Sequence, residues 1–106
     1  MRNEADLDRT TIPYTDAASA TLLDSAVDAL VTVRGGRRSD PGARLSVLAS
    51  LSAELNERTR DLVWRARRHQ LSWEIIAERL ATTASAARSR YDEHVKAREE
   101  AWRRVS

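Results

Sequence analysis

The sequence contains no cysteine, only two prolines and three glycines, and no long uncharged apolar run. Without cysteine the chain forms neither disulfides nor thiolate metal sites, so the redox environment has little bearing on it. No apolar segment is long enough to cross a membrane, and Met1–Ile12 is acidic and polar, unlike a signal peptide. We therefore expect a soluble cytoplasmic protein without membrane association.

Length and charge narrow the function classes further. The 106 residues suffice for one small domain with a core but without a deep substrate cavity. Residues 1–33 carry a net charge of −4, residues 34–70 of +5 and residues 71–106 of +1. The positive middle is able to attract an anionic polymer, and the acidic start is not. A solvated helix face of mixed charges is the alternative interpretation of the same pattern.

Apolar residues recur at helical spacing and do not alternate as in a strand, so the predicted fold class is all-α. Residues 1–14 lack this periodicity and contain Pro13, and we expect a flexible N-terminal segment there. Thr15 or Asp16 is placed to cap an N-terminal helix over residues 15–34.

Two adjacent glycines, Gly35 and Gly36, end that helix and begin a basic linker over residues 35–39. No nucleotide-binding glycine pattern surrounds them, so a linker is favoured over a phosphate cradle. The Asp-Pro pair at 40–41 is a start signal for a long helix that reaches about His69.

The long helix carries a row of leucines. Leu48, Leu55 and Leu62 lie seven residues apart, which suits packing against one neighbouring helix. Trp64 lies off this row, and with Val63 it is expected to meet Trp73 or the rest of the C-terminal core. The positions between the leucines are filled by Leu45, Leu51, Thr59 and Ala66.

Residues 72–92 predict two short helices joined by a tight turn. Ser72 is placed to cap the first helix and Thr83 the second. Small residues at Ala77, Ala84 and Ala87 allow the helices to cross closely, which is the packing that a helix-turn-helix motif requires. The predicted apolar positions are Ile76, Ala77 and Leu80 in the first helix and Ala84, Ala87, Tyr91 and Val95 in the second.

This segment resembles the helix-turn-helix family of sigma-factor region 4 and many small bacterial regulators, whose usual pattern is roughly S-W-x-x-I-A-x-x-L-G-V-S-x-x-A-A-x-x-R-Y. It differs at Ala81, where the family usually has glycine, and at Thr82, where it usually has a hydrophobic residue. Alanine in a left-handed turn costs about 1 kcal/mol. We expect a helix-turn-helix domain over residues 40–106. The residues shared with the family pattern are Ser72, Trp73, Ile76, Ala77, Leu80, Ala86, Ala87, Arg90 and Tyr91.

Helical rotation gives the last helix an outward face that includes Ser85 and Ser89, with Arg88 on its flank. Arg88 is the one member of this set able to make a bidentate contact to guanine. Ala84 reaches a thymine methyl group only if it leans outward. The predicted DNA-binding residues are Thr83, Ala84, Ser85, Arg88 and Ser89 for bases and nearby phosphates, with Arg79, Arg90, Arg67 and Arg68 as neutralisers of the DNA backbone.

The sequence offers no constellation for catalysis. His69 and His94 lie on different predicted helices, without a metal-ligand spacing or a nearby ligand cluster. The serines have no base in a defined relation to them. We expect neither an enzyme nor a metal or cofactor site.

The predicted function is sequence-specific binding of double-stranded DNA by a small transcriptional regulator. A single arginine for base contacts is too little for tight binding by one copy, so we expect a homodimer. Its interface would come from the acidic first helix or from the apolar stripe between Val95 and Trp102. The alternative is a protein-interaction module that keeps the fold but binds another regulator, a sigma factor or a toxin.

Overall fold

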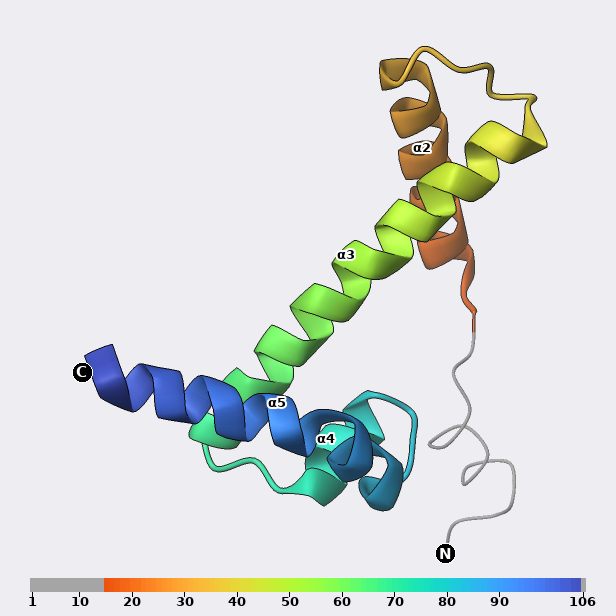
Figure 1. Ribbon diagram of the computed structural model, residues 1–106. Coiled ribbons are helices and arrows are strands. Elements are labelled where there is room, and N and C mark those ends of the chain that lie inside the picture. Colours follow the sequence, from red (N-terminus) through yellow and green to blue (C-terminus); the bar gives the residue numbers. More distant parts are fainter. Residues whose placement is uncertain (1–14, 106) are drawn as a thin grey trace, which may run out of the picture. The chain divides into compact units, whose positions relative to one another are not determined.

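The structure, a computed structural model, describes residues 15–105. Over this range it is all-α, with no strand (Figure 1). The predicted flexible segment, residues 1–14, lies outside the described residues. The helices are α2 (Ala17–Val33), α3 (Pro41–Arg68), α4 (Trp73–Arg79) and α5 (Ala84–Val105).

The chain divides into two units. One, which we call the hairpin unit, is Thr15–Glu57 and holds α2 with the first part of α3. The other, the C-terminal unit, comprises the described residues 58–105 and holds the end of α3 with α4 and α5. The helices of both units begin and end close to the residues predicted from the sequence.

The ends of α2 confirm the predicted capping. Asp16 accepts hydrogen bonds from the Ser19 backbone N–H and from the Ser19 hydroxyl, each at 2.7 Å. At the other end, Gly35 adopts a left-handed backbone with φ of 77°. The Gly36 N–H then donates to the Val31 carbonyl at 2.9 Å, which closes the last turn.

The core of the hairpin unit is small. Val27 and Val31 of α2 pack with Val47 of α3, and these three are its only fully buried hydrophobic residues among those described. The predicted leucine row is not buried, because Leu48, Leu55 and Leu62 remain 40%, 60% and 57% exposed. The half-buried residues around this core are Leu30, Ala43 and Leu51.

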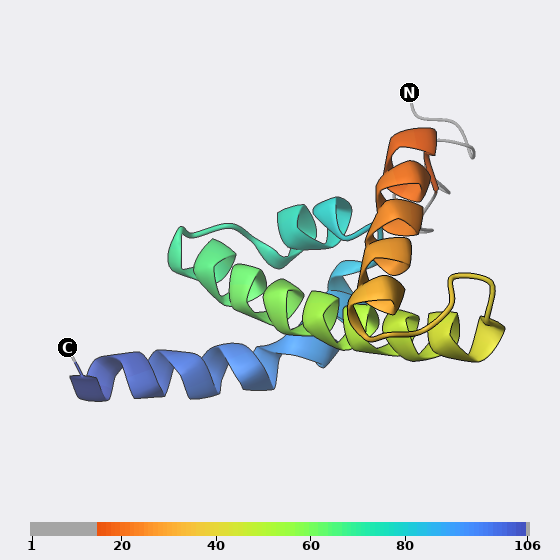
Figure 2. The same cartoon turned by 90° about the horizontal axis from the view of Figure 1, so that it is seen from above.

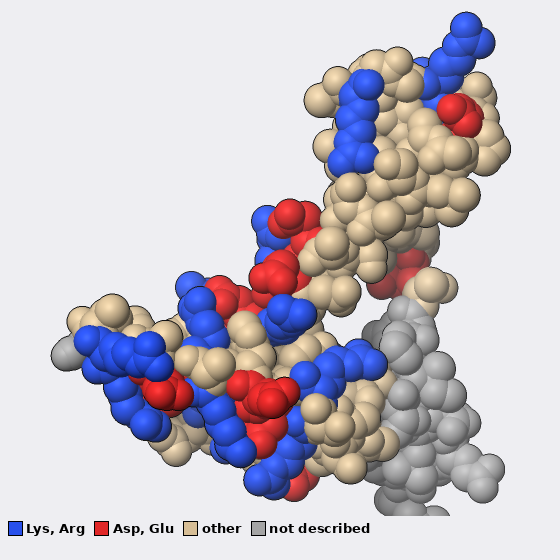
Figure 3. All heavy atoms as spheres, viewed as in Figure 1, with Lys and Arg blue, Asp and Glu red and all other residues tan. Residues whose placement is uncertain are grey.

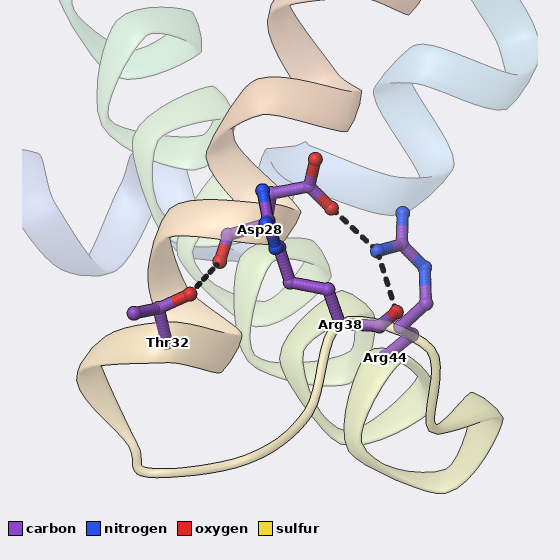
Figure 4. A network of polar contacts seen from close by, with 4 residues as sticks. All are labelled: Asp28, Thr32, Arg38 and Arg44. Carbon is purple, nitrogen blue, oxygen red and sulfur yellow. Dashed lines mark hydrogen bonds and ion pairs between the residues drawn. The ribbon is translucent and has the colours of Figure 1, made fainter.

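One ion pair joins the two helices of the hairpin unit. Arg44 of α3 donates to the Asp28 carboxylate of α2 at 2.6 Å (Figure 4). The same guanidinium nitrogen also donates to the Arg38 carbonyl in the connecting loop at 3.3 Å. This contact therefore fixes the loop as well as the two helices.

The C-terminal unit has a larger core to which all three of its helices contribute. Its buried residues come from the end of α3, from one face of α4 and from the first turns of α5. Along the chain α5 continues far beyond these turns (Figure 2), as predicted from its apolar stripe. The buried members are Val63, Trp73, Ile76, Ala77, Ala87 and Tyr91.

Candidate nucleic-acid interface

The turn between α4 and α5 is built on a left-handed residue. Ala81 has φ of 55°, the conformation for which the family pattern uses glycine. The Ala81 N–H donates to the Glu78 carbonyl at 3.2 Å, and the Thr82 N–H donates to the Ala77 carbonyl at 3.0 Å. These two bonds form a Schellman motif, which ends α4 and turns the chain sharply toward α5.

Both helices of this segment begin at the predicted caps. The Ser72 hydroxyl accepts from the Ile75 N–H at 3.2 Å at the start of α4. The Thr83 hydroxyl accepts from the Ala86 N–H at 3.1 Å at the start of α5. Because Thr83 uses its oxygen as a cap, it is held beside the first turn of α5.

The outer face of α5 presents the predicted polar group. Ser85, Arg88 and Ser89 are all exposed and line one shallow depression. Asp92 and Glu93 line the same depression one turn further along, with Lys96. Basic and acidic side chains thus share this surface, and phosphate is favoured only near the start of the helix.

Two of the predicted residues lie elsewhere. Ala84 packs against the core of the C-terminal unit, so its methyl group is not part of the outer face. Arg90 lies roughly 200° around the helix from Arg88, and it lines a separate depression beside the turn residues Ala81 and Thr82. Arg79 is exposed at the end of α4.

Arg67 and Arg68 are engaged within the chain. Arg67 donates to the Leu71 carbonyl at 2.9 Å, and its guanidinium lies 5.1 Å from the Trp73 ring centre. Arg68 donates to both carboxylate oxygens of Glu99, at 2.9 and 3.0 Å. A phosphate contact by Arg68 would have to compete with this carboxylate.

Arg68 belongs to an aromatic cluster that sequence reasoning missed. Trp64 of α3 lies 5.9 Å from Trp102 of α5 between ring centres, and its indole N–H donates to Glu99 at 3.1 Å. The guanidinium of Arg68 lies 4.6 Å from the Trp102 ring centre, and that of Arg98 lies 4.6 Å from the Trp64 ring centre. The sequence offers only a local sign, an arginine four residues from a tryptophan on each helix, from Trp64 to Arg68 and from Arg98 to Trp102.

This cluster changes two sequence predictions. Trp64 was expected to meet Trp73 or the core of the C-terminal unit, whereas it packs against Trp102. The stripe from Val95 to Trp102 was expected as one possible dimer interface, whereas the end of α3 covers part of Trp102 and leaves it 45% exposed. Val63 does lie in the core, as expected.

The histidines form no constellation with other ligands. His69 is exposed, and the buried Nε2 atom of His94 has no hydrogen-bond partner within the described part of the chain. Across residues 15–105, no group of three or more His, Asp or Glu side chains is placed to hold a metal ion. None of the helices described is both long and apolar enough to span a bilayer.

No protein-family model, curated protein or solved structure matches this chain.

Proposed function

We propose that this chain binds double-stranded DNA through the first turns of α5 and acts as a small homodimeric transcriptional regulator of the helix-turn-helix type. The α4–turn–α5 geometry carries the proposal: two capped helices are joined through left-handed Ala81, and the second exposes its first turns. A recognition helix of this kind enters the major groove with its N-terminal residues nearest the base edges.

The side chains on that face have suitable chemistry. Arg88 has the reach and the paired donors for the O6 and N7 atoms of guanine. Ser85 and Ser89 have hydroxyls for shorter contacts to bases or phosphates, and Arg79 and Arg90 are exposed near the α4–α5 turn for contacts to the DNA backbone. Ala84, Arg67 and Arg68 are left out because their contacts lie within the chain.

The net charges of the two units also favour DNA binding by the C-terminal unit. Residues 58–105 contain twelve Arg and Lys against seven Asp and Glu, a net charge of +5. Residues 15–57 contain four against six, a net charge of −2. On the face drawn in Figure 3, charged side chains crowd the C-terminal unit, and the hairpin unit is mostly uncharged. Phosphate therefore favours the C-terminal unit.

One observation favours a second function, a protein-interaction module. Asp92 and Glu93 lie beside Arg88, and a groove of about 570 Å³ next to them mixes both signs of charge. Such a surface suits a partner protein with complementary charges better than a continuous phosphate backbone. The groove is lined by Arg67, Trp73, Arg88, Asp92, Val95, Lys96, Glu99, Glu100 and Arg103.

Binding to DNA duplexes tests the proposal. Fluorescence anisotropy with random and genomic fragments should give affinities that fall steeply with salt, because bound phosphates release counterions. Arg88→Ala should cost about 1–3 kcal/mol at a selected site and leave the helical content unchanged by circular dichroism.

Arg104→Ala is the matched control, because it removes the same charge from the last turn of the same helix. It should leave specific binding nearly unchanged. Equal losses in the two variants would place the contact surface away from the start of α5. Absence of binding to any duplex at low salt would favour the protein-interaction module.

A further inference from the structure

The helix α2 carries two apolar rows, and the structure covers one of them. The inner row contains Val27 and Val31, which are buried against α3. We call the second the outer row: Leu22, Ala26, Ala29 and Val33, at spacings of four, three and four residues. Its end members Leu22 and Val33 are 72% and 81% exposed, Ala29 is exposed as well, and Ala26 is half-buried. Spacing of this kind is that of a helix-pairing surface.

The small core gives a reason for the outer row to be covered. Val27, Val31 and Val47 are the only fully buried hydrophobic residues of the hairpin unit among those described. Three buried valines are little stabilisation for two helices and their connecting loop. A helix that is apolar on nearly all sides is normally buried on more than one of them.

The order of residues in the outer row fits a second copy as the occupant. It runs large, small, small, large, so it is nearly the same in both directions. An antiparallel pair with its two-fold axis between Val27 and Asp28 sets Leu22 opposite the second copy's Val33, and Ala26 opposite Ala29. Alanines at the centre allow close approach, and the larger side chains fill the two ends.

Charge agrees with self-pairing. At 100° per residue, Asp24 and Asp28 both lie more than about 120° from the centre of the outer row, so two copies bring no like charges together. Asp28 is in addition paired with Arg44 (Figure 4). Antiparallel packing also brings the end of α2 that holds Asp16 toward the end that is followed by Arg37 and Arg38 in the other copy.

We propose that the outer row of α2 is a homodimer interface, formed by antiparallel, two-fold pairing with the outer row of a second copy. The inference gives the homodimer of the proposed function its contact surface, but it depends on the hairpin unit alone. Its test is therefore oligomeric state, which is read independently of DNA. Two helices of this length bury less area than a standard interface of about 1,200–2,000 Å², so dissociation is expected in the micromolar range.

Sedimentation of the full chain tests the pairing. Between about 1 and 100 µM, chosen to span that range, the wild-type chain should shift from 11.9 kDa toward twice that mass. Leu22→Glu should remain a monomer over the same range with its helical content retained. Leu45→Glu is the matched control, because Leu45 is an equally exposed leucine of the same unit on α3. It should dimerise like the wild type.

The antiparallel register has its own test. Leu22→Glu and Val33→Lys should each be monomeric alone, but an equimolar mixture should form a heterodimer, because the new glutamate then faces the new lysine. A parallel pair would give no such rescue, so a mixture that stays monomeric overturns the register and with it the proposal.

Other outcomes also overturn the proposal. If the wild-type chain stays monomeric, a second copy does not cover the outer row, and residues 1–14 or a different protein become the candidates to cover it. If the Leu22→Glu chain still dimerises, the interface lies elsewhere. If only the Leu45→Glu chain loses the dimer, the interface lies on α3. By contrast, a wild-type chain that dimerises through the outer row but binds no DNA duplex would contradict the proposed function and support this interface.

Discussion

At the residue scale, three helices end through a residue in the left-handed region. The residues are Gly35, Gln70 and Ala81, with φ of 77°, 68° and 55°. At each end the next N–H donates back five residues: from Gly36 to Val31, from Leu71 to Ala66 and from Thr82 to Ala77. Only the first uses glycine, so Gln70 and Ala81 carry the steric cost of a Cβ atom in this conformation.

Replacing Ala81 by glycine removes that cost. Ala81→Gly should raise the free energy of unfolding by about 1 kcal/mol, measured by urea denaturation. Ala86→Gly is the control, because Ala86 lies in the right-handed helix α5, where the same change should lower stability by about 1 kcal/mol. A loss of stability in both variants would mean that the turn does not strain alanine.

Helix caps can be predicted from the sequence, whereas left-handed residues that are not glycine cannot. Ser72, Thr83 and Asp16 were predicted from side-chain chemistry, because a short oxygen at that position satisfies a free N–H. Gln70 has no such signal. Its conformation follows from the packing of Leu71 against the core, a tertiary effect that local preference does not contain.

Asp16 predicts an acid-sensitive contribution to α2. Hydrogen bonds from Ser19, first from its backbone N–H and then from its hydroxyl, lower the pKa of Asp16 below its ordinary value of 3.8. The charged form is therefore favoured in the folded state. Its stabilisation is present above pH 3.8 and is lost as the pH falls through the lowered pKa.

Thermal unfolding at pH 6 and pH 3 measures this contribution. Asp16→Asn keeps a capping side chain but cannot titrate, so its stability should fall less than that of the wild type between the two pH values. Ser19→Ala should also lose less, since it removes the hydroxyl donor. An equal decrease in all three proteins would rule out a linkage through Asp16.

At the element scale, α3 shows why periodicity predicts a helix better than it predicts the helix's partner. Its leucines and the row containing Val47 and Leu51 have the same helical repeat and differ only in direction around the axis. The covered row is the one with Val47, and Gly36 helps to select it. A Cβ atom on Gly36 would lie 3.3 Å from a Val31 methyl group and 3.4 Å from Ala43.

The aromatic cluster was not predicted from the sequence because its hydrogen-bonded members lie 31 and 35 residues apart in the chain. Each helix gave a local hint, an arginine four residues from a tryptophan. The decisive contact is Glu99, which accepts from both Trp64 and Arg68 of the other helix. Only the direction in which α5 crosses the end of α3 brings these groups together.

Glu99→Gln should therefore destabilise the fold through that junction. The variant loses the charge that Arg68 pairs with and retains one carbonyl oxygen for two donors, at a cost of about 1–2 kcal/mol in urea denaturation. Glu100→Gln is the control, because Glu100 pairs with Arg104 on its own helix and this pair is exposed. That change should cost no more than about 0.5 kcal/mol. Equal losses of stability in the two variants would mean that the Glu99 contact contributes no more than an exposed ion pair.

At the scale of the whole molecule, the charge pattern was visible in the sequence, but its boundaries were not. In the sequence, the most positive segment is residues 34–70. In the structure, the boundary between the two units lies near residue 58, within the continuous helix α3. The change from mostly uncharged to charged residues, near Glu54, lies inside a helix, and a helical pattern that continues across it does not predict a division there. Of the predicted DNA-binding arginines, Arg88 and Arg79 are exposed, while Arg68 is paired with Glu99. That pairing depends on α5, which the local pattern does not contain.

If DNA binding depends on where the charges lie and not only on the net charge, two variants of equal net charge should differ in their affinity for DNA. Glu93→Gln removes an acid beside Arg88, and Asp24→Asn removes one from the hairpin unit. Removing one repulsive charge close to phosphate should raise affinity for a random duplex about two- to fourfold at low salt, and the gain should fade as salt screens it. Asp24→Asn should leave the affinity unchanged. Equal gains in the two variants, measured by anisotropy across a salt series, would show that DNA responds to the net charge of the chain and not to the outer face of α5.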